Sequence, residues 1–200
     1  MIEAPPHRIG LGGIAQWHFR VLVLLCISVA AAFSQEVGGE WKAYLRGVGP
    51  LRIGMSIGDV RALVGEPDAF LVQALRQRPQ MPREPDDTAC GYLVSSALPD
   101  GIDLMFKFGR LERIDVRAGP TATASGAKIG DSESRILEIY GERIVVRQSH
   151  YPPAGAHEMI YVPVDAADSE YSLLFGTDGS VVTGFRVGTK SAVEAAESCA

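Results

Sequence analysis

One stretch of the chain has the spacing of a catalytic serine. Gly54-Met55-Ser56-Ile57-Gly58 matches Gly-x-Ser-x-Gly, the nucleophile elbow in which a turn between a strand and a helix exposes a serine for acyl transfer. That chemistry also needs a histidine base and an acidic partner. A second stretch, Gly130-Asp131-Ser132-Glu133-Ser134, keeps the serine but lacks the last glycine. The shared serine is placed to cap a helix in both stretches, so we predict no catalytic residue here.

Two histidines, His150 and His157, could take part in acid–base or metal chemistry. Together with Asp165 or Asp168 they could form a metal site. Their spacing of seven residues falls in a Pro-containing loop, however, and not at i and i+4 on a helix. We therefore expect solvated loop histidines, with no metal site and no cofactor. A small periplasmic hydrolase that uses one of these histidines is the alternative.

The elements that would position these residues occur twice. Residues 53–66 align without a gap with residues 129–142, and both copies begin with Ile-Gly-x-Ser and end with Gly-Glu. Each copy has a serine suited to the N-cap, an apolar stripe at helical spacing and a glycine stop. The pattern predicts two helices of two to three turns, and a further helical turn is predicted over residues 69–75.

Strand signals follow each predicted helix, after a loop rich in proline and polar residues. Leu104, Phe106 and Phe108 alternate onto one face, which is typical of a half-buried strand. The predicted strands are residues 91–94, 103–108, 111–116, 159–162, 171–175 and 181–187. The expected fold is α+β: two tandem repeats, residues 35–120 and 121–200, each with a short helical unit packed on an antiparallel sheet of about three to four strands. A lead-in over residues 35–50 is expected to be a short helix or extended.

The N-terminus has the order of a secretory signal. Arg8 and Arg20 precede an apolar run over residues 21–32, and small residues follow, with cleavage allowed after Ala32 or Ser34. The run is shorter than the roughly 20 residues that span a bilayer. We expect a signal peptide over residues 1–34, no stable membrane insertion after cleavage, and a periplasmic or secreted protein. An uncleaved anchor is the alternative.

The charge of the chain argues against some partners. The formal net charge is −5, and removing residues 1–34 changes it to −6 because Arg8, Arg20 and Glu3 are lost. A mildly acidic chain is a poor match for nucleic acid or an anionic membrane surface. The basic residues Arg76, Arg78 and Arg83 are followed by acidic ones and indicate a solvated loop.

Two cysteines remain after the predicted cleavage, Cys90 and Cys199. In an exported protein they most simply form one disulfide, which would tie down the C-terminus. A redox-active pair usually has closer spacing, as in Cys-x-x-Cys, so a structural disulfide is favoured.

The repeated Ile-Gly-x-Ser start and late glycine resemble those of tandem-repeat secreted proteins similar to the beta-lactamase inhibitor protein. The Ile53-Gly54-Met55-Ser56 start also resembles that of small outer-membrane assembly lipoproteins, and Glu197-Ser198-Cys199 resembles the tail of some exported bacterial proteins. The resemblance implies a protein-binding module without catalytic residues, built from a helical unit on a short antiparallel sheet. It does not imply beta-lactamase as the partner, because a fold does not fix a function.

The sequence thus favours a non-catalytic protein-binding module of the bacterial envelope, with inhibition of a secreted or periplasmic enzyme as one form of that binding. The binding surface is expected on the open sheet face and the two Pro-rich loops. Tyrosines there are candidate anchors, because tyrosine is enriched at binding hot spots. The candidate partner-binding residues are Tyr92, Tyr151, His157 and Tyr161. Tyr92 and Tyr161 could instead lie in the sheet core.

Overall fold

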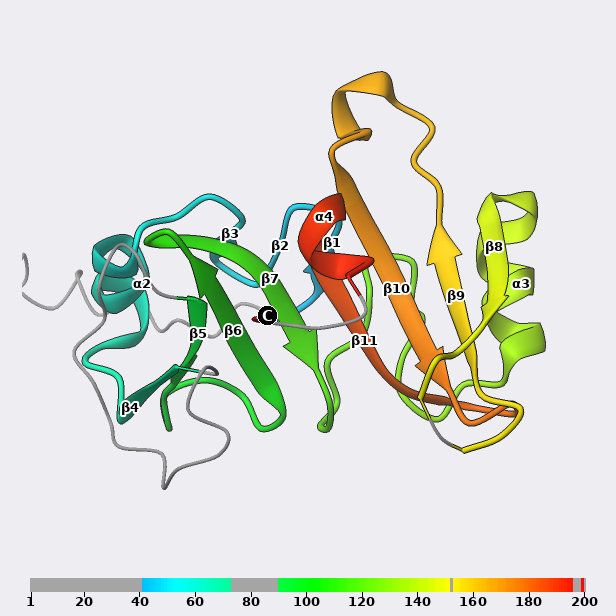
Figure 1. The fold of residues 1–200 in the computed structure, drawn as a ribbon, viewed down its shortest axis with the longest axis horizontal. Helices are drawn as coiled ribbons and strands as arrows, with labels where there is room; N and C mark the ends of the chain where they lie inside the picture. Colours follow the sequence, from blue (N-terminus) through cyan, green and yellow to red (C-terminus); the bar gives the residue numbers. More distant parts are fainter. Residues whose placement is uncertain (1–40, 73–89, 152, 196–198, 200) are drawn as a thin grey trace, which may run out of the picture. The chain divides into compact units, whose positions relative to one another are not determined.

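The computed structural model describes residues 41–72, 90–151, 153–195 and 199 (Figure 1). The predicted signal peptide, residues 1–34, lies outside the described residues, as do Arg76, Arg78 and Arg83 of the first Pro-rich loop. All described residues belong to one unit, residues 40–200.

Two helices of 8 residues each occur where the repeated pattern predicts them, α2 (Ile57–Val64) and α3 (Glu133–Tyr140). The side chain of Ser56 accepts a hydrogen bond from the Asp59 backbone, and the Asp59 carboxylate accepts one from the Ser56 backbone. This reciprocal capping box satisfies N–H groups that the first helical turn leaves unpaired. Ser132 caps α3 through the first of these two bonds, since its side chain accepts a hydrogen bond from the Arg135 backbone. The Ser56 hydroxyl is therefore used by the helix.

The strands form two antiparallel sheets. The small sheet contains β1 (Ala43–Tyr44), β2 (Gly47–Val48) and β3 (Leu51–Arg52). The large sheet has eight strands in the order β4-β5-β6-β7-β11-β10-β9-β8. Its strands are β4 (Ala69–Val72), β5 (Cys90–Val94), β6 (Ile102–Lys107), β7 (Arg110–Val116), β8 (Ile144–Gln148), β9 (His157–Tyr161), β10 (Tyr171–Thr177) and β11 (Val182–Thr189). Short helices η2 (Gly141–Arg143), η3 (Ala166–Asp168) and α4 (Lys190–Val193) complete the fold.

The structure is thus mixed helix and sheet, with mostly antiparallel strands, as the predicted fold class states at this level. The strands on either side of residue 120 do not form two separate sheets. They join where β7 pairs with β11, with Val116 opposite Phe185 and Ile114 opposite Val187. This pairing makes one continuous eight-stranded sheet (Figure 1).

Two strands at the ends of the sheet were not predicted. The helical turn expected over residues 69–75 is wrong for its first part, because Ala69–Val72 is strand β4 paired with β5. Phe70 is buried there and packs edge-on against Phe106, with ring centroids 6.4 Å apart. Burial of this ring against the sheet outweighs the weak local preference for a helix. β8, at the opposite end, falls in a stretch for which no strand was predicted.

Two further predictions, on Phe108 and on the lead-in, can be compared with the structure. Phe108 does not share the buried face of Leu104 and Phe106, because it lies in the β6–β7 turn with φ of 52° and its side chain is exposed. A turn residue leaves the period-two alternation of the strand before it. The lead-in is extended where it is described: β1 and β2 occupy part of residues 41–50.

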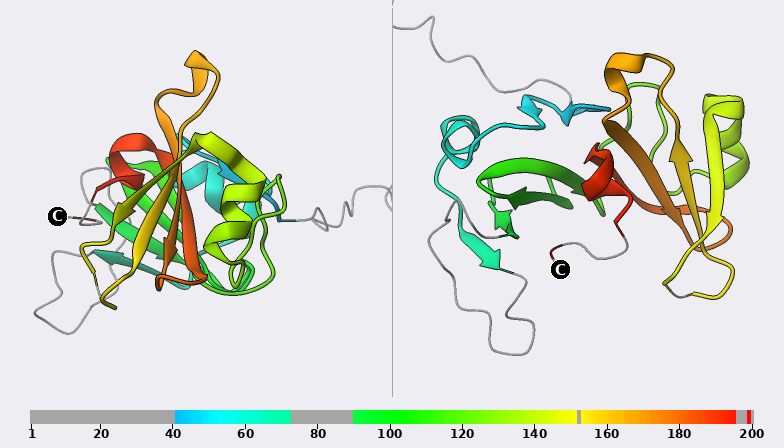
Figure 2. Two further views of the ribbon diagram at one scale, coloured as in Figure 1. Left: turned by 90° about the vertical axis from the view of Figure 1, so that its right-hand side faces the viewer. Right: turned by 45° about the horizontal axis from the view of Figure 1, so that its top comes forward.

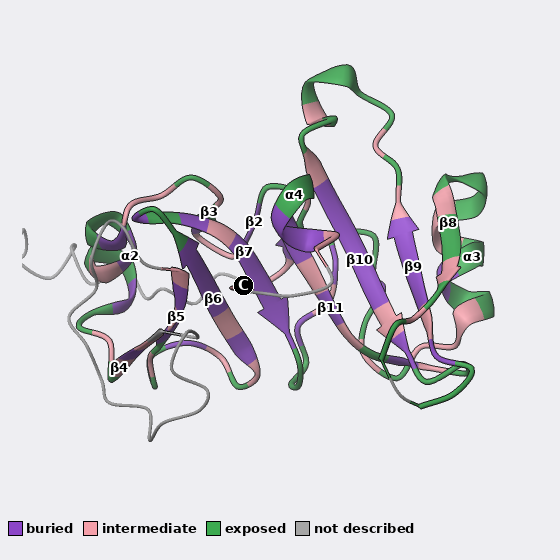
Figure 3. Ribbon diagram, in the orientation of Figure 1, coloured by how far each residue is buried: buried purple, intermediate pink, exposed green. Residues whose placement is uncertain are grey.

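The large sheet has two unlike faces (Figures 2 and 3). The face toward α2 and α3, here called the helix face, carries the main apolar core, which includes Leu93, Leu104, Phe106, Ile114, Val116, Phe175 and Phe185 together with Val60 of α2 and Ile136 of α3. The opposite face, here called the polar face, carries the alternate residues of the same strands. A small apolar cluster of Ile160, Leu174 and Val193 lies on it where α4 packs. Helices α2 and α3 therefore lie on one side of the large sheet, and α4 lies on the other.

The predicted disulfide between Cys90 and Cys199 is present, with an S–S distance of 2.02 Å and a sequence separation of 109 residues. Cys90 begins β5 two residues before Tyr92, and alternate strand residues share a face. The bond therefore ties Cys199 to the polar face of the sheet.

Candidate functional site

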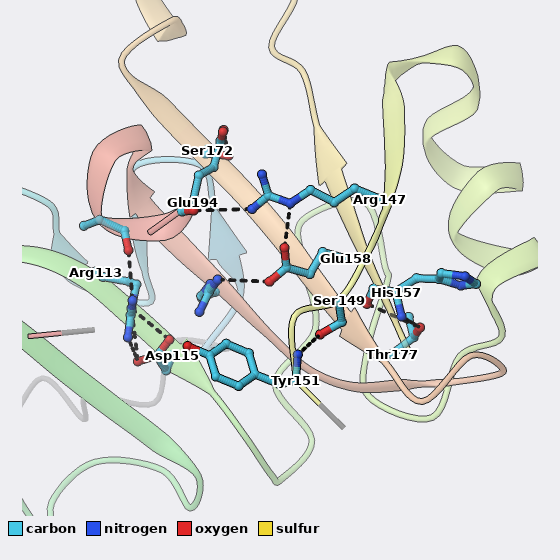
Figure 4. Close-up of polar contacts among 12 residues, drawn as sticks. Arg113, Asp115, Arg147, Ser149, Tyr151, His157, Glu158, Ser172, Thr177 and Glu194 are labelled. Carbon is cyan, nitrogen blue, oxygen red and sulfur yellow. Dashed lines mark hydrogen bonds and ion pairs between the residues drawn. The ribbon is translucent and has the colours of Figure 1, made fainter. Parts of the chain in front are cut away.

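Charged side chains lie on the polar face at the centre of the large sheet, a place where buried strands usually carry apolar side chains. They come from five strands that are far apart in the sequence, and four of these side chains, Arg113, Asp115, Arg147 and Glu158, are labelled in Figure 4. Their members are Tyr92 of β5, Arg113 and Asp115 of β7, Arg147 of β8, Glu158 of β9 and Arg186 of β11. On β5, β7, β9 and β11 they alternate with helix-face core residues, whose burial directs the polar groups to the opposite side. Arg147 of β8 shares that side because it is paired with Glu158. We call this set the polar network.

The deepest part of the polar network is the pair Arg113 and Asp115. The Arg113 side chain is 1% exposed, and its Nε lies 3.0 Å from Asp115 Oδ1. Its Nη1 donates to the backbone oxygen of Ala192 at 2.8 Å, and its Nη2 donates to the Tyr92 hydroxyl. A buried charge is tolerated when it is both paired and hydrogen-bonded, and Arg113 meets both conditions.

A second pair lies toward the β8 edge. Arg147 Nε donates to Glu158 Oε2 at 2.6 Å, and Arg147 Nη2 donates to the backbone oxygen of Glu194 at 3.3 Å. The Glu194 carboxylate in turn accepts a hydrogen bond of 3.1 Å from Ser172. Both arginine pairs thus reach carbonyl groups in or next to α4, which fixes this short helix on the polar face.

Arg186 lies between the two pairs. It is opposite Asp115 in the β7–β11 register, and its Nη2 is 3.6 Å from Glu158 Oε1. Burial, and then the neighbouring charge of Arg113, lowers the pKa of the Arg186 guanidinium from its ordinary value. Burial and a neighbouring positive charge thus disfavour the charged form of Arg186.

A half-buried carboxyl, Asp103, lies at the rim of the polar network. Burial raises the pKa of Asp103, while the nearby Arg117 guanidinium, with Nε 2.8 Å from Oδ2, opposes that rise. The negative charge of Asp115 adds to the rise. The rim thus contains a carboxyl whose charged form is disfavoured by the fold.

The structure separates the four predicted partner-binding residues. Tyr92 and Tyr151 lie on the side of the polar network: the Tyr92 hydroxyl donates to Asp115 at 3.3 Å, and the Tyr151 ring points from the β8–β9 loop toward the network (Figure 4). Tyr161 packs with the helix-face core, its ring centroid 5.3 Å from that of Tyr140. His157 also lies on the helix face, with Nδ1 2.9 Å from Glu133 Oε1.

The hydroxyl of Thr177 also donates to that Glu133 oxygen, so the carboxylate serves two partners at the start of α3. His150 is exposed in the β8–β9 loop. Within the residues that the structure describes, no cluster of three or more His, Cys, Asp or Glu side chains could hold a metal ion.

Sequence reasoning missed the polar network, although its signal was present. Arg113-Ile114-Asp115-Val116 places two charges at positions that alternate with apolar residues. Such alternation predicts a solvated face, and nothing local indicates that the charges become buried against each other.

Comparison with known proteins does not add a family. No protein-family model, no curated protein and no solved structure matches this chain. None of the helices in the described part of the chain has the length and apolar character needed to cross a bilayer.

Proposed function

We propose that this protein is an exported, non-catalytic protein-binding module of the bacterial envelope, periplasmic or secreted. It binds a protein partner through the polar face near β8 and β9, and needs no cofactor. Inhibition of a secreted or periplasmic enzyme is one form that this binding takes. The resemblance to tandem-repeat secreted inhibitor proteins supports the same class.

The observation that carries this proposal is a group of exposed apolar and aromatic side chains beside the polar network. Val145 is 52% exposed and lies two residues before Arg147, on the same face of β8. Tyr151 is 50% exposed in the loop that follows. Val162, also exposed, follows β9 at the other end of the β8–β9 hairpin, where its N–H donates to the Arg143 oxygen beside the start of β8. We call Val145, Arg147, Tyr151 and Val162 the valine–tyrosine patch.

The composition of the valine–tyrosine patch suits a protein interface. Protein interfaces are enriched in tyrosine and arginine, and their hot spots combine an apolar anchor with a fixed polar group. Arg147 is held in place by Glu158 and by the Glu194 backbone, so little side-chain freedom is lost when a partner binds. A rigid arginine between exposed valine and tyrosine side chains is the arrangement that such an anchor needs.

Export is supported by the disulfide and by the predicted signal peptide. A disulfide persists in oxidising compartments and is rare where thiols are kept reduced. The Cys90–Cys199 bond therefore fits the periplasm or the cell exterior.

We also propose that the two halves of the sheet are copies of one unit. Each half has a capped helix followed by four strands, and the two capped turns make matching backbone contacts. The N–H of Gly54 bonds to the Leu111 oxygen, and the N–H of Gly130 bonds to the Val182 oxygen. The return bonds also match: Leu111 N–H to Met55 and Val182 N–H to Asp131. Duplication would explain the strand order, because the second set of four strands runs in reverse beside the first.

The test is capture of partners from a periplasmic extract, identified by mass spectrometry, followed by affinity measurement. Val145→Glu should abolish capture. Val146→Glu is the matched control, because Val146 is 47% exposed on the same strand but points to the helix face. Tyr151→Ala has its own control in Tyr44→Ala, since Tyr44 is equally exposed on β1. Equal loss of binding in variants and controls would contradict the proposal.

A hydrolase remains the second candidate, favoured by one observation. His157 and Glu133 form a histidine–carboxylate pair at 2.9 Å, an arrangement that orients an imidazole for acid–base chemistry. A panel of hydrolase substrates, assayed with and without chelator, would detect it. Turnover abolished by His157→Ala or His150→Ala in a protein that captures no partner would replace binding with catalysis.

A further inference from the structure

Arg186 differs from the other arginines of the polar face in its contacts. Arg113, Arg147 and Arg117 each have a carboxylate oxygen within 3.0 Å of their Nε. In the described part of the chain, the ion pair of Arg186 is a longer one of 3.6 Å to Glu158, whose other oxygen is already held by Arg147. Among the described residues its Nε is buried and has no hydrogen-bond partner. Arg186 thus shares the Glu158 carboxylate with Arg147, and its contact of 3.6 Å is longer than the 2.6 Å contact of Arg147.

The environment of Arg186 makes this shortage costly. Its side chain is 19% exposed, so water compensates little of the charge. Asp115 and Glu158 attract it and Arg113 repels it, and the lowered pKa reports that burial and repulsion outweigh the attraction. An additional negative charge at this point would stabilise the guanidinium, and an arginine offers a carboxylate two parallel donors.

The sheet leaves room beside Arg186. Gly184 lies two residues before Arg186 on β11, and it is paired with Gly176 of β10. Gly176 is also paired with Glu158, so both glycines lie at polar-face positions. Because glycine has no side chain, the backbone is uncovered by its own residues there. A methyl group added at Gly176 would meet no atom closer than 3.8 Å. At Gly184 a methyl group would lie 3.1 Å from the Val116 backbone oxygen. We call this stretch without side chains the glycine floor; Val145 lies toward the β8 edge of the sheet, and the Tyr151 ring points toward the polar network (Figure 4).

Two other carboxylates of the described residues, those of Glu194 and Asp103, are held by other partners. Glu194 Oε1 accepts the hydrogen bond from Ser172, beside α4 and away from the glycine floor. Asp103 is held by Arg117 at the rim. Within the described residues, the negative charge that Arg186 lacks is therefore not supplied by these groups.

We propose that Arg186 receives the carboxylate of an aspartate or glutamate side chain of the partner protein, which lies over Gly176 and Gly184. The inference rests on the proposed protein-binding function and names the chemistry that the partner must present. The partner inserts one acidic side chain between the two arginine pairs, and its surrounding residues contact the valine–tyrosine patch. Charge complementarity at this point selects the partner and its register.

The first test uses a small probe and needs no identified partner. The blocked amino acid N-acetyl-glutamate N-methylamide is titrated into the disulfide-bonded protein, with the glutamine analogue as control. The Nε–H signal of Arg186 and the amide signals of Gly176 and Gly184 are followed in proton–nitrogen correlation spectra. We expect saturable shifts with the glutamate probe only. Equal shifts with both probes, or none, would overturn the proposal.

Two variants test the same site independently in the complex with a captured partner. Arg186→Gln should weaken the partner's dissociation constant at least about tenfold, because an inserted carboxylate would be left buried without its cation. Gly176→Leu should do the same by filling the floor while leaving Arg186 intact. Arg135→Gln, an exposed arginine on α3, is the control and should leave affinity unchanged. Near-UV circular dichroism checks that each variant is folded.

The outcomes separate this inference from the proposed function. Loss of capture in Val145→Glu with unchanged affinity in both Arg186→Gln and Gly176→Leu would leave protein binding in place and overturn the acidic insertion. Glutamate-specific shifts in a protein that captures no partner would overturn the assignment to a partner protein, since the carboxylate would then come from another source. Tight capture that both site variants weaken supports the inference.

Discussion

Replacing Asp115 with alanine tests whether the polar network stabilises the fold only as a complete set. Arg113 is buried, and Asp115 is its carboxylate partner at 3.0 Å. Removing that carboxylate leaves a buried guanidinium with the Tyr92 hydroxyl and the Ala192 oxygen, which are neutral acceptors. We expect Asp115→Ala to fold with much lower stability than the parent.

The size of the loss follows from the burial of the pair. Breaking a buried ion pair by removing one partner costs about 3–5 kcal/mol, because the other charge stays buried and uncompensated. For a domain of this size, each 1 kcal/mol shifts Tm by about 2–4 °C, so the loss corresponds to about 6–20 °C. Replacing both partners, as in Arg113→Met/Asp115→Leu, removes the charge as well as its partner. The double variant should therefore recover most of the stability.

Urea unfolding of the disulfide-bonded protein measures these free energies. The matched control is the exposed pair Arg135 and Glu138, which has the same N–O distance of 3.0 Å. Glu138→Ala should cost less than about 0.5 kcal/mol, because an exposed pair is solvated in both states. A loss below about 1 kcal/mol in Asp115→Ala, or a double variant as unstable as the single one, would refute the reasoning.

Three further predictions concern stability. Cys90→Ser/Cys199→Ser should lower the free energy of unfolding by up to about 4–5 kcal/mol, since the bond closes a long loop in the unfolded chain; an unchanged urea midpoint would contradict this. Ser56→Ala and Ser132→Ala should each cost about 1 kcal/mol through a lost cap, and thermal melts showing no loss in either would rule out the capping role. The raised pKa of Asp103 means that its protonated form favours folding at low pH and that this contribution is lost as pH rises through the folded pKa. Asp103→Asn should therefore gain Tm relative to the parent between pH about 3 and 7, and a constant or falling difference would show that the sign is wrong.

The two helices illustrate what could be predicted from local sequence. Ser56 and Ser132 lie at the N-caps, and Gly65 and Gly141 end the helices with positive φ of 79° and 59°. These signals act within one or two turns of the chain, so they operate wherever the segment lies. The β6–β7 hairpin was predictable for the same reason, since its strands are adjacent in sequence.

The candidate site was predicted only in outline. The open sheet face was expected to carry function, and Tyr151 lies on that side. Arg113, Arg147 and Arg186 were not singled out, because they come from three strands whose neighbours in the sheet could not be inferred. Their contacts depend on β11 lying beside β7 and on β9 lying beside β8.

The sequence by itself determined the two capped helices, the hairpin strands and the pairing of Cys90 with Cys199, because each depends on local backbone chemistry or on the few cysteines available. Only the tertiary structure decided that β4 is a strand, that β7 and β11 join eight strands into one sheet, and that the charges between them are buried. Strand pairing over long sequence separations is selected by the burial of whole faces and not by any single segment. The properties of Arg186 follow from that pairing, since its burial and its shared carboxylate exist only in the assembled sheet.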